Sequence, residues 1–325
     1  MLTSVFAPDS KQLPIRFGVA LPPAVASLDE HLLLAQAAEA AGLDLIGVMD
    51  LPYHSRYLDT LSLIGMLLAR SERVHIFPDV ANLPLRPPAM LAKAAASLDL
   101  LSGGRFELGL GSGGYWDAIK TFGVRPLTRA QSVHALEEAI AIIRALWSGA
   151  HGIRFSGDHY RLEDATGGPT PPHEIGIWIG AQGTRLLETT GRLAGGWAAP
   201  IPSYLPYERW GEAQTRIDSA ARAAGRDPRA IRRLAQVVGA VTDSPGPTWE
   251  PAGAAPIRGH AAQWADVITH LVEELRFDAV VFWPEQASVA QIGRFAEIAT
   301  EFRNRCDGRP LPKNRQAVNR GGSHA

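Results

Sequence analysis

Short apolar runs alternate along this chain with longer segments in which apolar residues recur every three or four positions. The short runs are typical of buried strands, and the longer segments are typical of amphipathic helices. The predicted strands are Ile15–Leu21, Leu45–Met49, Val74–Val80, Phe106–Leu110, Ile175–Gly180, Gly196–Ala199, Leu234–Val241 and Ala279–Trp283. The predicted helices are Leu28–Ala41, Leu58–Arg70, Ala89–Leu101, Ala130–Leu146, Thr184–Leu193, Glu208–Ala224, Ala262–Leu275 and Ser288–Arg305. This alternation predicts an α/β fold, a (β/α)8 barrel that needs about eight parallel strands.

Two stretches interrupt this alternation. Ala150–Glu174, after the fourth predicted helix, contains several glycines and prolines, and Asp243–Gly259, near the seventh predicted strand, is rich in proline, alanine and glycine. Long insertions of this kind are usually lids or binding loops. We expect an N-terminal extension over residues 1–14, one barrel domain over residues 15–306, and a disordered polar tail over residues 307–325.

Composition narrows the possible partners. The chain has 325 residues, a formal net charge of −1 and no clustered basic face, so we expect neither nucleic acid nor an anionic membrane as a partner. Cys306 is the single cysteine, which excludes an intramolecular disulfide and a multi-cysteine metal site, and we predict no metal. No apolar run has the length of a signal peptide or of a membrane span, so we expect a cytoplasmic location.

The segment Leu83–Gly114 contains a loop, a helix, a tight turn, a strand and a glycine loop in succession. Pro87 and Pro88 suit a first helical turn, and the glycines after Ser102 suit its end. On the strand that follows, one face carries Phe106, Leu108 and Leu110, whereas the other carries Glu107, Gly109 and Gly111. The small residues on the second face predict space in which a flat ligand approaches the backbone.

This segment resembles the bacterial luciferase-like superfamily, which carries a similar proline-rich loop, LD-LSGGR motif, short strand and glycine loop. Further similar motifs are AGLDLIGVMD (41–50), ALWSG (145–149), FSGDHYRL (155–162), IWIGAQGT (177–184) and GRLAGGW (191–197). The resemblance covers most of Ile15 to Phe302. It implies a TIM barrel whose active site lies at the C-terminal ends of the strands.

The resemblance also implies a flavin-type ring as the cofactor. Some branches of the superfamily use FMN with dioxygen, while others transfer hydride with the deazaflavin coenzyme F420. Asp50, the segment Ala223–Pro228 and the pattern from Gly259 to Pro284 are more similar to the deazaflavin branches. F420 is therefore the favoured cofactor and FMN the alternative. The chain departs from the sugar-phosphate dehydrogenases of the superfamily, because no acidic residue lies in Gly111–Gly114.

Two glycine-rich corners, Gly111–Gly114 and Gly180–Thr184, follow successive predicted strands, and we expect them to bind the phosphate of the cofactor. The second opens into a predicted helix, whose free N–H groups favour an anion. The resemblance adds an arginine partner at Arg129 and a cis peptide bond close to Ala81-Asn82 that supports the face of the ring. The expected cofactor-binding residues are Ala81, Asn82, Gly111, Ser112, Gly113, Arg129, Gly180, Ala181, Gln182, Gly183 and Thr184.

Candidate catalytic residues follow the second predicted strand. His54 is the expected proton donor or acceptor, because an imidazole titrates near neutral pH, and Asp50 lies close by in sequence. Leu51 and Pro52 follow Asp50, so the histidine does not come directly after the aspartate. The alternative is that Asp50 and His54 only cap a helix and form a surface hydrogen bond. Glu107 is expected to have a structural role beside either His75 or Arg86, between which the sequence does not choose.

Aromatic residues near the predicted strand ends suggest an apolar substrate pocket. They are Tyr53, Tyr115, Trp116, Trp197 and Trp283. The predicted function is hydride transfer between F420 and a small, apolar organic substrate. The alternatives are an FMN-dependent monooxygenase served by a flavin reductase, a non-catalytic flavin-binding barrel, and a phosphate-handling barrel lyase or isomerase. Alanine-rich surfaces at Leu32–Ala41 and Ala89–Ala96 would permit a homodimer.

Overall fold

The structure is a computed structural model that describes residues 13–24 and 28–306. The predicted tail over residues 307–325 and all but the last two residues of the predicted N-terminal extension lie outside the described residues. Among the described residues, no helix combines the length and the apolar character needed to cross a membrane.

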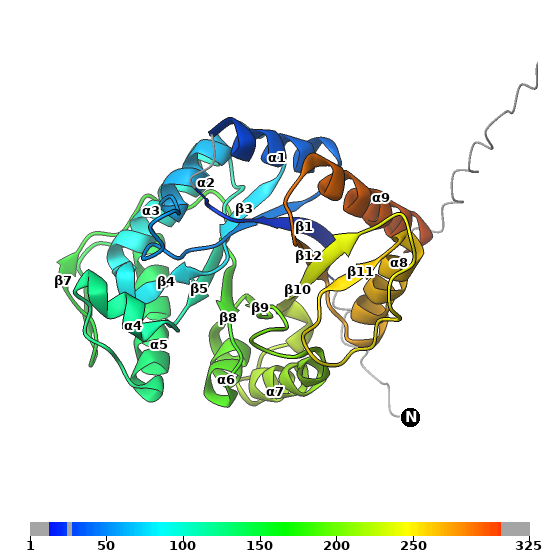
Figure 1. The fold of residues 1–325 in the computed structure, drawn as a ribbon. Coiled ribbons are helices and arrows are strands. Elements are labelled where there is room, and N and C mark those ends of the chain that lie inside the picture. Colours follow the sequence, from blue (N-terminus) through cyan, green and yellow to red (C-terminus); the bar gives the residue numbers. More distant parts are fainter. Residues whose placement is uncertain (1–12, 25–27, 307–325) are drawn as a thin grey trace, which may run out of the picture.

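Parallel strands form a closed barrel at the centre of the molecule (Figure 1). Their order is β3-β2-β1-β12-β10-β9-β8-β5, and a bridge between Ile76 and Phe106 joins β3 to the chain just before β5 and closes the ring. The barrel strands are β1 (Arg16–Leu21), β2 (Leu45–Val48), β3 (His75–Pro78), β5 (Leu108–Gly111), β8 (Ile177–Gly180), β9 (Gly196–Ala198), β10 (Arg232–Val241) and β12 (Ala279–Pro284). Each predicted strand is confirmed, as is the TIM-barrel fold.

Two short strands lie at the C-terminal rim. The strand β4 (Ala81–Asn82) pairs with the end of β5, and β11 (Ile257–Gly259) pairs with the end of β10. The chain that leaves β3 therefore crosses to β5 before it enters the next helix.

Helices surround the barrel on the outside (Figure 1). They are α1 (Leu28–Ala40), α2 (Thr60–Leu68), α3 (Pro88–Ser102), α4 (Trp116–Ile119), α5 (Arg129–Trp147), α6 (Thr184–Leu193), α7 (Trp210–Ala223), α8 (Ala261–Thr269) and α9 (Val289–Cys306). Short 3-10 turns lie at Leu83–Leu85, Lys120–Phe122, Tyr207–Arg209 and Pro228–Ala230, and a π-helical turn at His270–Glu274 extends α8. The predicted helices are confirmed, and the start of α3 at Pro88 and its end before left-handed Gly103 (φ 69°) follow the expected capping.

The first insertion forms an antiparallel hairpin on the outside of the barrel. Its strands are β6 (Ile153–Ser156) and β7 (Arg161–Ala165). The buried carboxylate of Glu138 on α5 accepts hydrogen bonds from the backbone N–H groups of Asp158, His159 and Tyr160, at 2.7, 3.1 and 3.0 Å. These bonds anchor the hairpin to α5.

The interior of the barrel is packed at one end and open at the other. A buried cluster inside it consists of Ala20, Leu45, Phe77, Trp178, Ala198, Leu234, Ala279 and Val281. The rings of Phe77 and Trp178 cross it in an edge-to-face contact, with centroids 5.0 Å apart. Closer to the C-terminal strand ends, small or polar residues such as Gly47, Gly180 and Gln236 take the place of bulky ones. This change of side-chain size leaves room for a cavity at that end.

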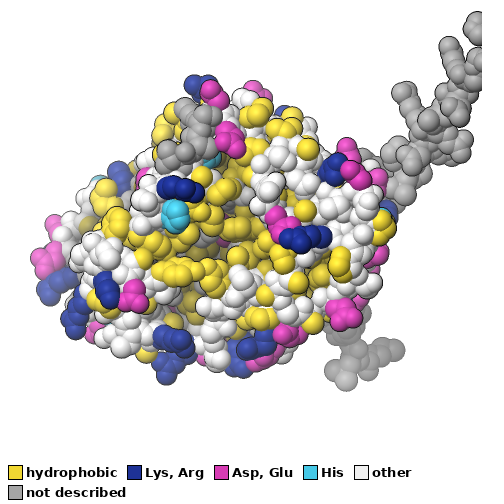
Figure 2. All heavy atoms as spheres, viewed as in Figure 1, with side chains coloured by type: hydrophobic (Ala, Val, Ile, Leu, Met, Phe, Trp, Pro, Cys, Tyr) yellow, Lys and Arg dark blue, Asp and Glu magenta, His cyan; other side chains and the backbone are white. Residues whose placement is uncertain are grey.

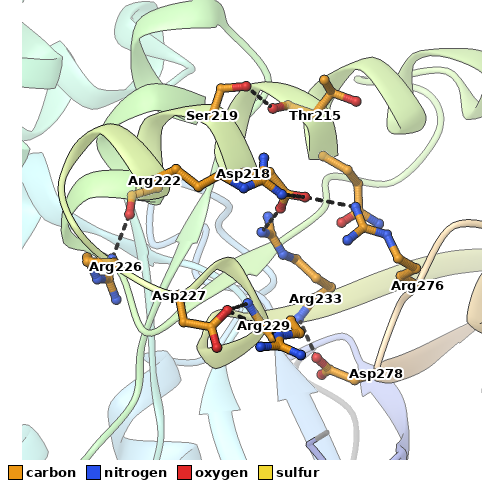
Figure 3. Close-up of polar contacts among 12 residues, drawn as sticks. Thr215, Asp218, Ser219, Arg222, Arg226, Asp227, Arg229, Arg233, Arg276 and Asp278 are labelled. Atoms are coloured by element: carbon orange, nitrogen blue, oxygen red, sulfur yellow. Dashed lines mark hydrogen bonds and ion pairs between the residues drawn. The ribbon is translucent and has the colours of Figure 1, made fainter. Parts of the chain in front are cut away.

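Ion pairs lie at the N-terminal ends of β10 and β12 (Figure 3), and the one between Asp218 and Arg233 is buried. Asp218 on α7 binds Arg233 at 2.7 Å and Arg276 at 2.9 Å, and Asp278 binds Arg232 at 2.9 Å. Burial raises the pKa of Asp278 to about 6, although Arg232 opposes the shift. In a barrel of this class, polar networks at the N-terminal end contribute to stability, and chemistry takes place at the other end.

Candidate active site

A cavity of about 290 Å³ opens at the C-terminal ends of the barrel strands. Figure 2 shows hydrophobic side chains gathered around a hollow at the centre of this face. The volume is near the lower end of the roughly 300–1,000 Å³ found for small-molecule sites. Among the described residues, Asp50 and Asp79 are the acidic side chains that line it, and no lysine, arginine or histidine does.

Both predicted glycine corners lie on this cavity. The strands β5 and β8 pair directly, with Leu110 opposite Ile179, so the corners that follow them are neighbours. Gly111, Ser112, Gly113 and Gly114 line the cavity from the first corner, and Gly180 and Gln182 line it from the second. A Cβ atom on Gly114 would meet no described atom within 4 Å, so this corner is open at that position.

The second corner leads straight into α6. Gly183 is the N-cap of this helix, and no side chain caps it. The first N–H groups of α6 therefore have no side-chain acceptor, and they carry the positive end of the helix dipole. Gly183 and Thr184 do not themselves line the cavity, whereas Ala181 is fully buried and its carbonyl oxygen accepts a hydrogen bond from Trp197 at 2.9 Å.

A non-proline cis peptide bond follows β3, at Asp79–Val80. The prediction placed it close to Ala81–Asn82, so its presence is confirmed and its position is two residues earlier. Asn82 lines the cavity and donates its backbone N–H to Asp50 Oδ2 at 2.8 Å. Ala81 also lines the cavity and pairs with Leu110 of β5.

The room left by the glycines of β5 is occupied by the protein itself. A Cβ atom on Gly109 would overlap the carbonyl oxygen of Pro78, and one on Gly111 would lie 2.8 Å from a methyl group of Val80. The same side chain would lie 3.0 Å from a Cβ atom on Gly180. The expected space on this strand face is therefore filled by the protein at Gly109, whereas Gly111, at the C-terminal end of the strand, does line the cavity. The glycines instead seat Val80 at the wall of the cavity.

Asp50 is buried and its carboxylate is fully engaged. Arg86 donates from Nε to Oδ2 at 2.6 Å and from a terminal nitrogen to Oδ1 at 2.7 Å. The same guanidinium reaches Asp59, the N-cap of α2, at 2.6 Å. Burial opposes ionisation of Arg86, but its two carboxylate partners outweigh this and raise its pKa. Asp50 thus positions the loop after β2, and both of its carboxylate oxygens accept hydrogen bonds from within the protein.

His54 does not line the cavity. It is exposed, and its ring stacks on Tyr57 with centroids 4.1 Å apart. The chain makes a turn here, because His54 N–H bonds back to the Leu51 carbonyl oxygen at 2.9 Å, and Tyr53 lines the cavity while His54 is exposed. This geometry does not support the expected role of His54 as proton donor or acceptor.

Three further predicted site residues also lie away from the cavity lining. Arg129 is an exposed first residue of α5, whose start is fixed on the outside of the barrel by the Thr128–Gln131 capping box. Trp197 is fully buried and stacks on Phe277, so it belongs to the core. Trp116 begins α4, and its ring lies 3.2 Å from the position that a Cβ atom on Gly113 would take.

Tyrosines form the mouth of the cavity. Tyr53 and Tyr115 meet edge to face with centroids 6.1 Å apart, and Tyr115 meets Tyr204 in the same way at 6.4 Å. The hydroxyl groups of Tyr115 and Tyr204 are hydrogen-bonded across the opening. Burial raises the pKa of Tyr53 and of Tyr204 to about 12, so both stay neutral. Trp283 completes the apolar wall.

Asp79 and Gln236 are the polar pair of this cavity that the sequence analysis missed. Gln236 Nε2 donates to Asp79 Oδ1 at 2.9 Å, and both residues line the cavity. A signal for Asp79 was present, because strand alternation from His75 and Phe77 puts it on the inward face. Gln236 is the corresponding inward residue of β10, two positions after buried Leu234.

Glu107 lies at the opposite end of the barrel. Its carboxylate accepts the Gly176 N–H at 2.7 Å and lies 3.7 Å from His75, 3.6 Å from Arg16 and 3.8 Å from His173. Burial opposes ionisation, but His173, His75 and the Gly176 N–H lower the pKa of Glu107 to about 2, and the pKa of His173 rises to about 9 beside Glu107 and Asp99. Of the two partners that the sequence left open, His75 lies beside Glu107, whereas Arg86 binds Asp50.

Comparison with known proteins is consistent with this geometry. A family model described as luciferase-like monooxygenase matches residues 12–304. The F420-dependent glucose-6-phosphate dehydrogenase of Microbacterium testaceum (strain StLB037) is 30% identical over 191 residues, which are 57% of this chain and 56% of that protein. The phthiodiolone/phenolphthiodiolone dimycocerosates ketoreductase of Mycobacterium kansasii is 36% identical over 174 residues, 51% of this chain and 45% of that one. The chain matches only about half the length of these curated relatives.

Solved structures show the same fold. An F420-dependent secondary alcohol dehydrogenase in complex with an F420-acetone adduct superposes with a TM-score of 0.76 at 18% identity, covering 88% of this chain and 98% of that chain. The monooxygenase RslO1 from Streptomyces bottropensis has a TM-score of 0.74 at 19% identity, covering 88% and 99%. At this level of identity the likeness establishes the fold alone.

Proposed function

The chain belongs to the luciferase-like monooxygenase family, and from that premise we propose that it is an oxidoreductase that binds the deazaflavin coenzyme F420. In this proposal it transfers a hydride between the coenzyme and a small apolar organic substrate. The observation that carries the proposal is the pair of neighbouring glycine corners on one cavity, at Gly111–Gly114 and Gly180–Thr184.

These residues fit the anionic arm of such a coenzyme. The uncapped N-terminus of α6 offers N–H donors and a favourable dipole, and Gly114 leaves open space beside it. Buried polar atoms without a hydrogen-bond partner among the described residues also lie on residues of the cavity wall, at Asp79 Oδ2, Asn82 Oδ1 and Trp283 Nε1. Unpaired buried polar groups are costly unless a ligand supplies their partners.

Relatives support F420 over FMN as the coenzyme. Three F420-dependent glucose-6-phosphate dehydrogenases, from Microbacterium testaceum, Nakamurella multipartita and Amycolatopsis mediterranei, match with 30%, 30% and 33% identity. When bound, a deazaflavin supplies two-electron hydride chemistry. The protein contributes binding, orientation and exclusion of water, the last through Tyr53, Tyr115 and Tyr204 at the mouth.

The charges of the cavity argue against a sugar phosphate as the substrate. Among the described residues its lining includes no cationic side chain, and its ionisable carboxyl groups are Asp50 and Asp79. A phosphorylated substrate needs donors or cations to replace its lost hydration. The tyrosine mouth and Trp283 suit instead a neutral molecule such as a small ketone or secondary alcohol.

A turnover assay tests this function. The purified protein is mixed anaerobically with F420 and a panel of secondary alcohols, and with reduced F420 and the matching ketones, while the absorbance of the coenzyme is followed. We expect turnover with alcohols or ketones and none with glucose 6-phosphate. Turnover only with reduced FMN and dioxygen would favour the monooxygenase alternative. Binding of the coenzyme without turnover on any substrate would favour the non-catalytic barrel.

We also propose a homodimer. Exposed apolar side chains on three consecutive helices, Leu33 on α1, Met66 on α2 and Met90 on α3, support an apolar contact on that side of the barrel. A flavin reductase as a partner belongs only to the FMN alternative.

A further inference from the structure

Asp79 is a buried acid in the wall of the cavity with half of its carboxyl group unused. Its Oδ1 accepts the hydrogen bond from Gln236 Nε2 at 2.9 Å. Its Oδ2 is buried, and no described residue gives it a hydrogen bond. That oxygen lies over Gly47 of β2, 2.9 Å from the place where a Cβ atom would stand. The absence of a side chain on Gly47 therefore makes the space that the carboxyl group occupies.

Among the described residues, no cation compensates a charge on this carboxyl group. Gly47 of β2 lies next to Oδ2 and Gln236 of β10 binds Oδ1, and neither carries a charge. The other carboxylate of the cavity, Asp50, is neutralised by Arg86. Burial raises the pKa of Asp79 to about 7, although the hydrogen bond from Gln236 opposes the shift. A buried carboxyl group without a cation favours its neutral form.

We propose that Asp79 is a positioning residue that keeps its proton in the folded protein up to about neutral pH, so that the cavity then accepts an electron-rich or anionic ring, and that ionisation of Asp79 at higher pH weakens the binding of such a ring. The ring class rests on the proposed function, whereas the protonation state of Asp79 does not.

The direction of the effect follows from charge and hydrogen bonding. Because Oδ1 already accepts from Gln236, the proton of the neutral acid belongs on Oδ2. The neutral acid then places no net charge in the wall of the cavity. The ionised acid would instead repel an anionic ring across a medium of low dielectric constant, where such repulsion is strong. A site of this kind binds the reduced, more electron-rich form of a redox ring with an affinity that depends on pH.

The protonation state is measured first, on the protein without added coenzyme. Infrared difference spectra between the wild type and Asp79→Asn, recorded from pH 5 to 9, isolate the C=O stretch of this one acid. We expect a protonated carboxylic acid band at pH 6 that is lost in the variant and disappears in the wild type near pH 7. If no protonated band distinguishes the two proteins at pH 6, the proposal is overturned.

Binding is measured second, by anaerobic titration with reduced FMN and with reduced F420. For the wild type we expect the affinity to fall about tenfold per pH unit at pH values above the pKa of Asp79, because binding then requires uptake of one proton. Asp79→Asn keeps an uncharged group of the same shape, and its affinity should stay constant over that range. Gln236→Leu removes the hydrogen bond that favours the ionised form, so it should move the fall to higher pH.

The two measurements separate the two proposals. Equal pH dependence in the wild type and in Asp79→Asn overturns the coupling between Asp79 and the ring. Failure of both proteins to bind either reduced ring at any pH overturns the proposed function and the ring assignment, while the infrared band still decides the state of Asp79. Melting temperatures of the variants confirm that each is folded.

Discussion

Arg86 holds Asp50 in a two-point ion pair, with Nε 2.6 Å from Oδ2 and a terminal nitrogen 2.7 Å from Oδ1. The same guanidinium binds Asp59 at the start of α2, so one side chain ties both ends of the loop that follows β2. That loop carries Tyr53 to the mouth of the cavity. The position of the mouth therefore depends on an arginine from outside the loop.

Loss of this arginine should destabilise the protein strongly. Arg86→Met leaves the buried Asp50 carboxylate without its cation, and we expect the free energy of unfolding to fall by about 3–5 kcal/mol. Chemical denaturation measures this change in the free energy of unfolding. Arg86→Lys, the matched control, keeps the charge but not the two-point geometry, so its free energy of unfolding should lie between those of the wild type and Arg86→Met. Asp50→Asn added to Arg86→Met should recover part of the loss, and no recovery would mean that the ion pair is not its source.

The two glycine corners should respond differently to alanine. A methyl group on Gly114 meets no protein atom within 4 Å, so Gly114→Ala should leave the melting temperature unchanged and weaken F420 binding about tenfold. A methyl group on Gly180 lies 3.0 Å from Val80, so Gly180→Ala should lower the free energy of unfolding by about 1–3 kcal/mol. Fluorescence titration and thermal melting separate the effects. Unchanged binding in Gly114→Ala would show that no ligand lies against this corner.

Removal of Tyr204 should open the mouth of the cavity. Tyr204 contacts Tyr115 through both ring and hydroxyl group, and Tyr204→Ala removes both. We expect quenching of the bound coenzyme's fluorescence by iodide to increase several-fold and KM for apolar substrates to rise, because water and solutes gain access. Tyr204→Phe keeps the ring and loses only the hydroxyl, so it should protect the coenzyme nearly as well as the wild type. Equal quenching in all three proteins would contradict a shielding role.

Stability should decrease at alkaline pH through His173. Its pKa is raised from 6.5 to about 9 by Glu107 and Asp99, so the folded protein holds a proton that the unfolded chain releases earlier. The stabilising contribution is complete below about pH 6.5 and is lost as pH rises through 9. His173→Gln should be less stable at pH 6 and show a flatter profile from pH 6.5 to 9. Parallel profiles for the variant and the wild type would contradict the assignment.

Strand and helix positions were predictable because their signals are local. Each barrel strand is a short apolar run, and α3 begins at a proline and ends at a left-handed glycine, as its sequence indicates. The glycine corners were equally visible, since each follows a strand directly. In contrast, the space predicted beside β5 is present at Gly111 but is filled at Gly109 by Pro78 and Val80, which are about 30 positions away in sequence.

Side-chain positions on loops were much less predictable. Sequence indicated that His54 and Arg129 follow the rim of the barrel, but a backbone turn directs His54 outward and a capping box starts α5 at the periphery. The sequence also left the partners of buried charges open, and in the structure Arg86 binds Asp50 and not Glu107. Asp79 could have been found from strand alternation, whereas its contact with Gln236 joins residues 157 positions apart.

The most direct test of the central claim is a fluorescence titration of the purified protein with F420 and, in parallel, with FMN. We expect saturable binding of F420 with a dissociation constant of about 1–10 µM or lower, equivalent to roughly 7–8 kcal/mol, and weaker binding of FMN. Failure of both to bind at these concentrations, in a protein whose melting curve shows it to be folded, would contradict the assignment of the cavity as a coenzyme site.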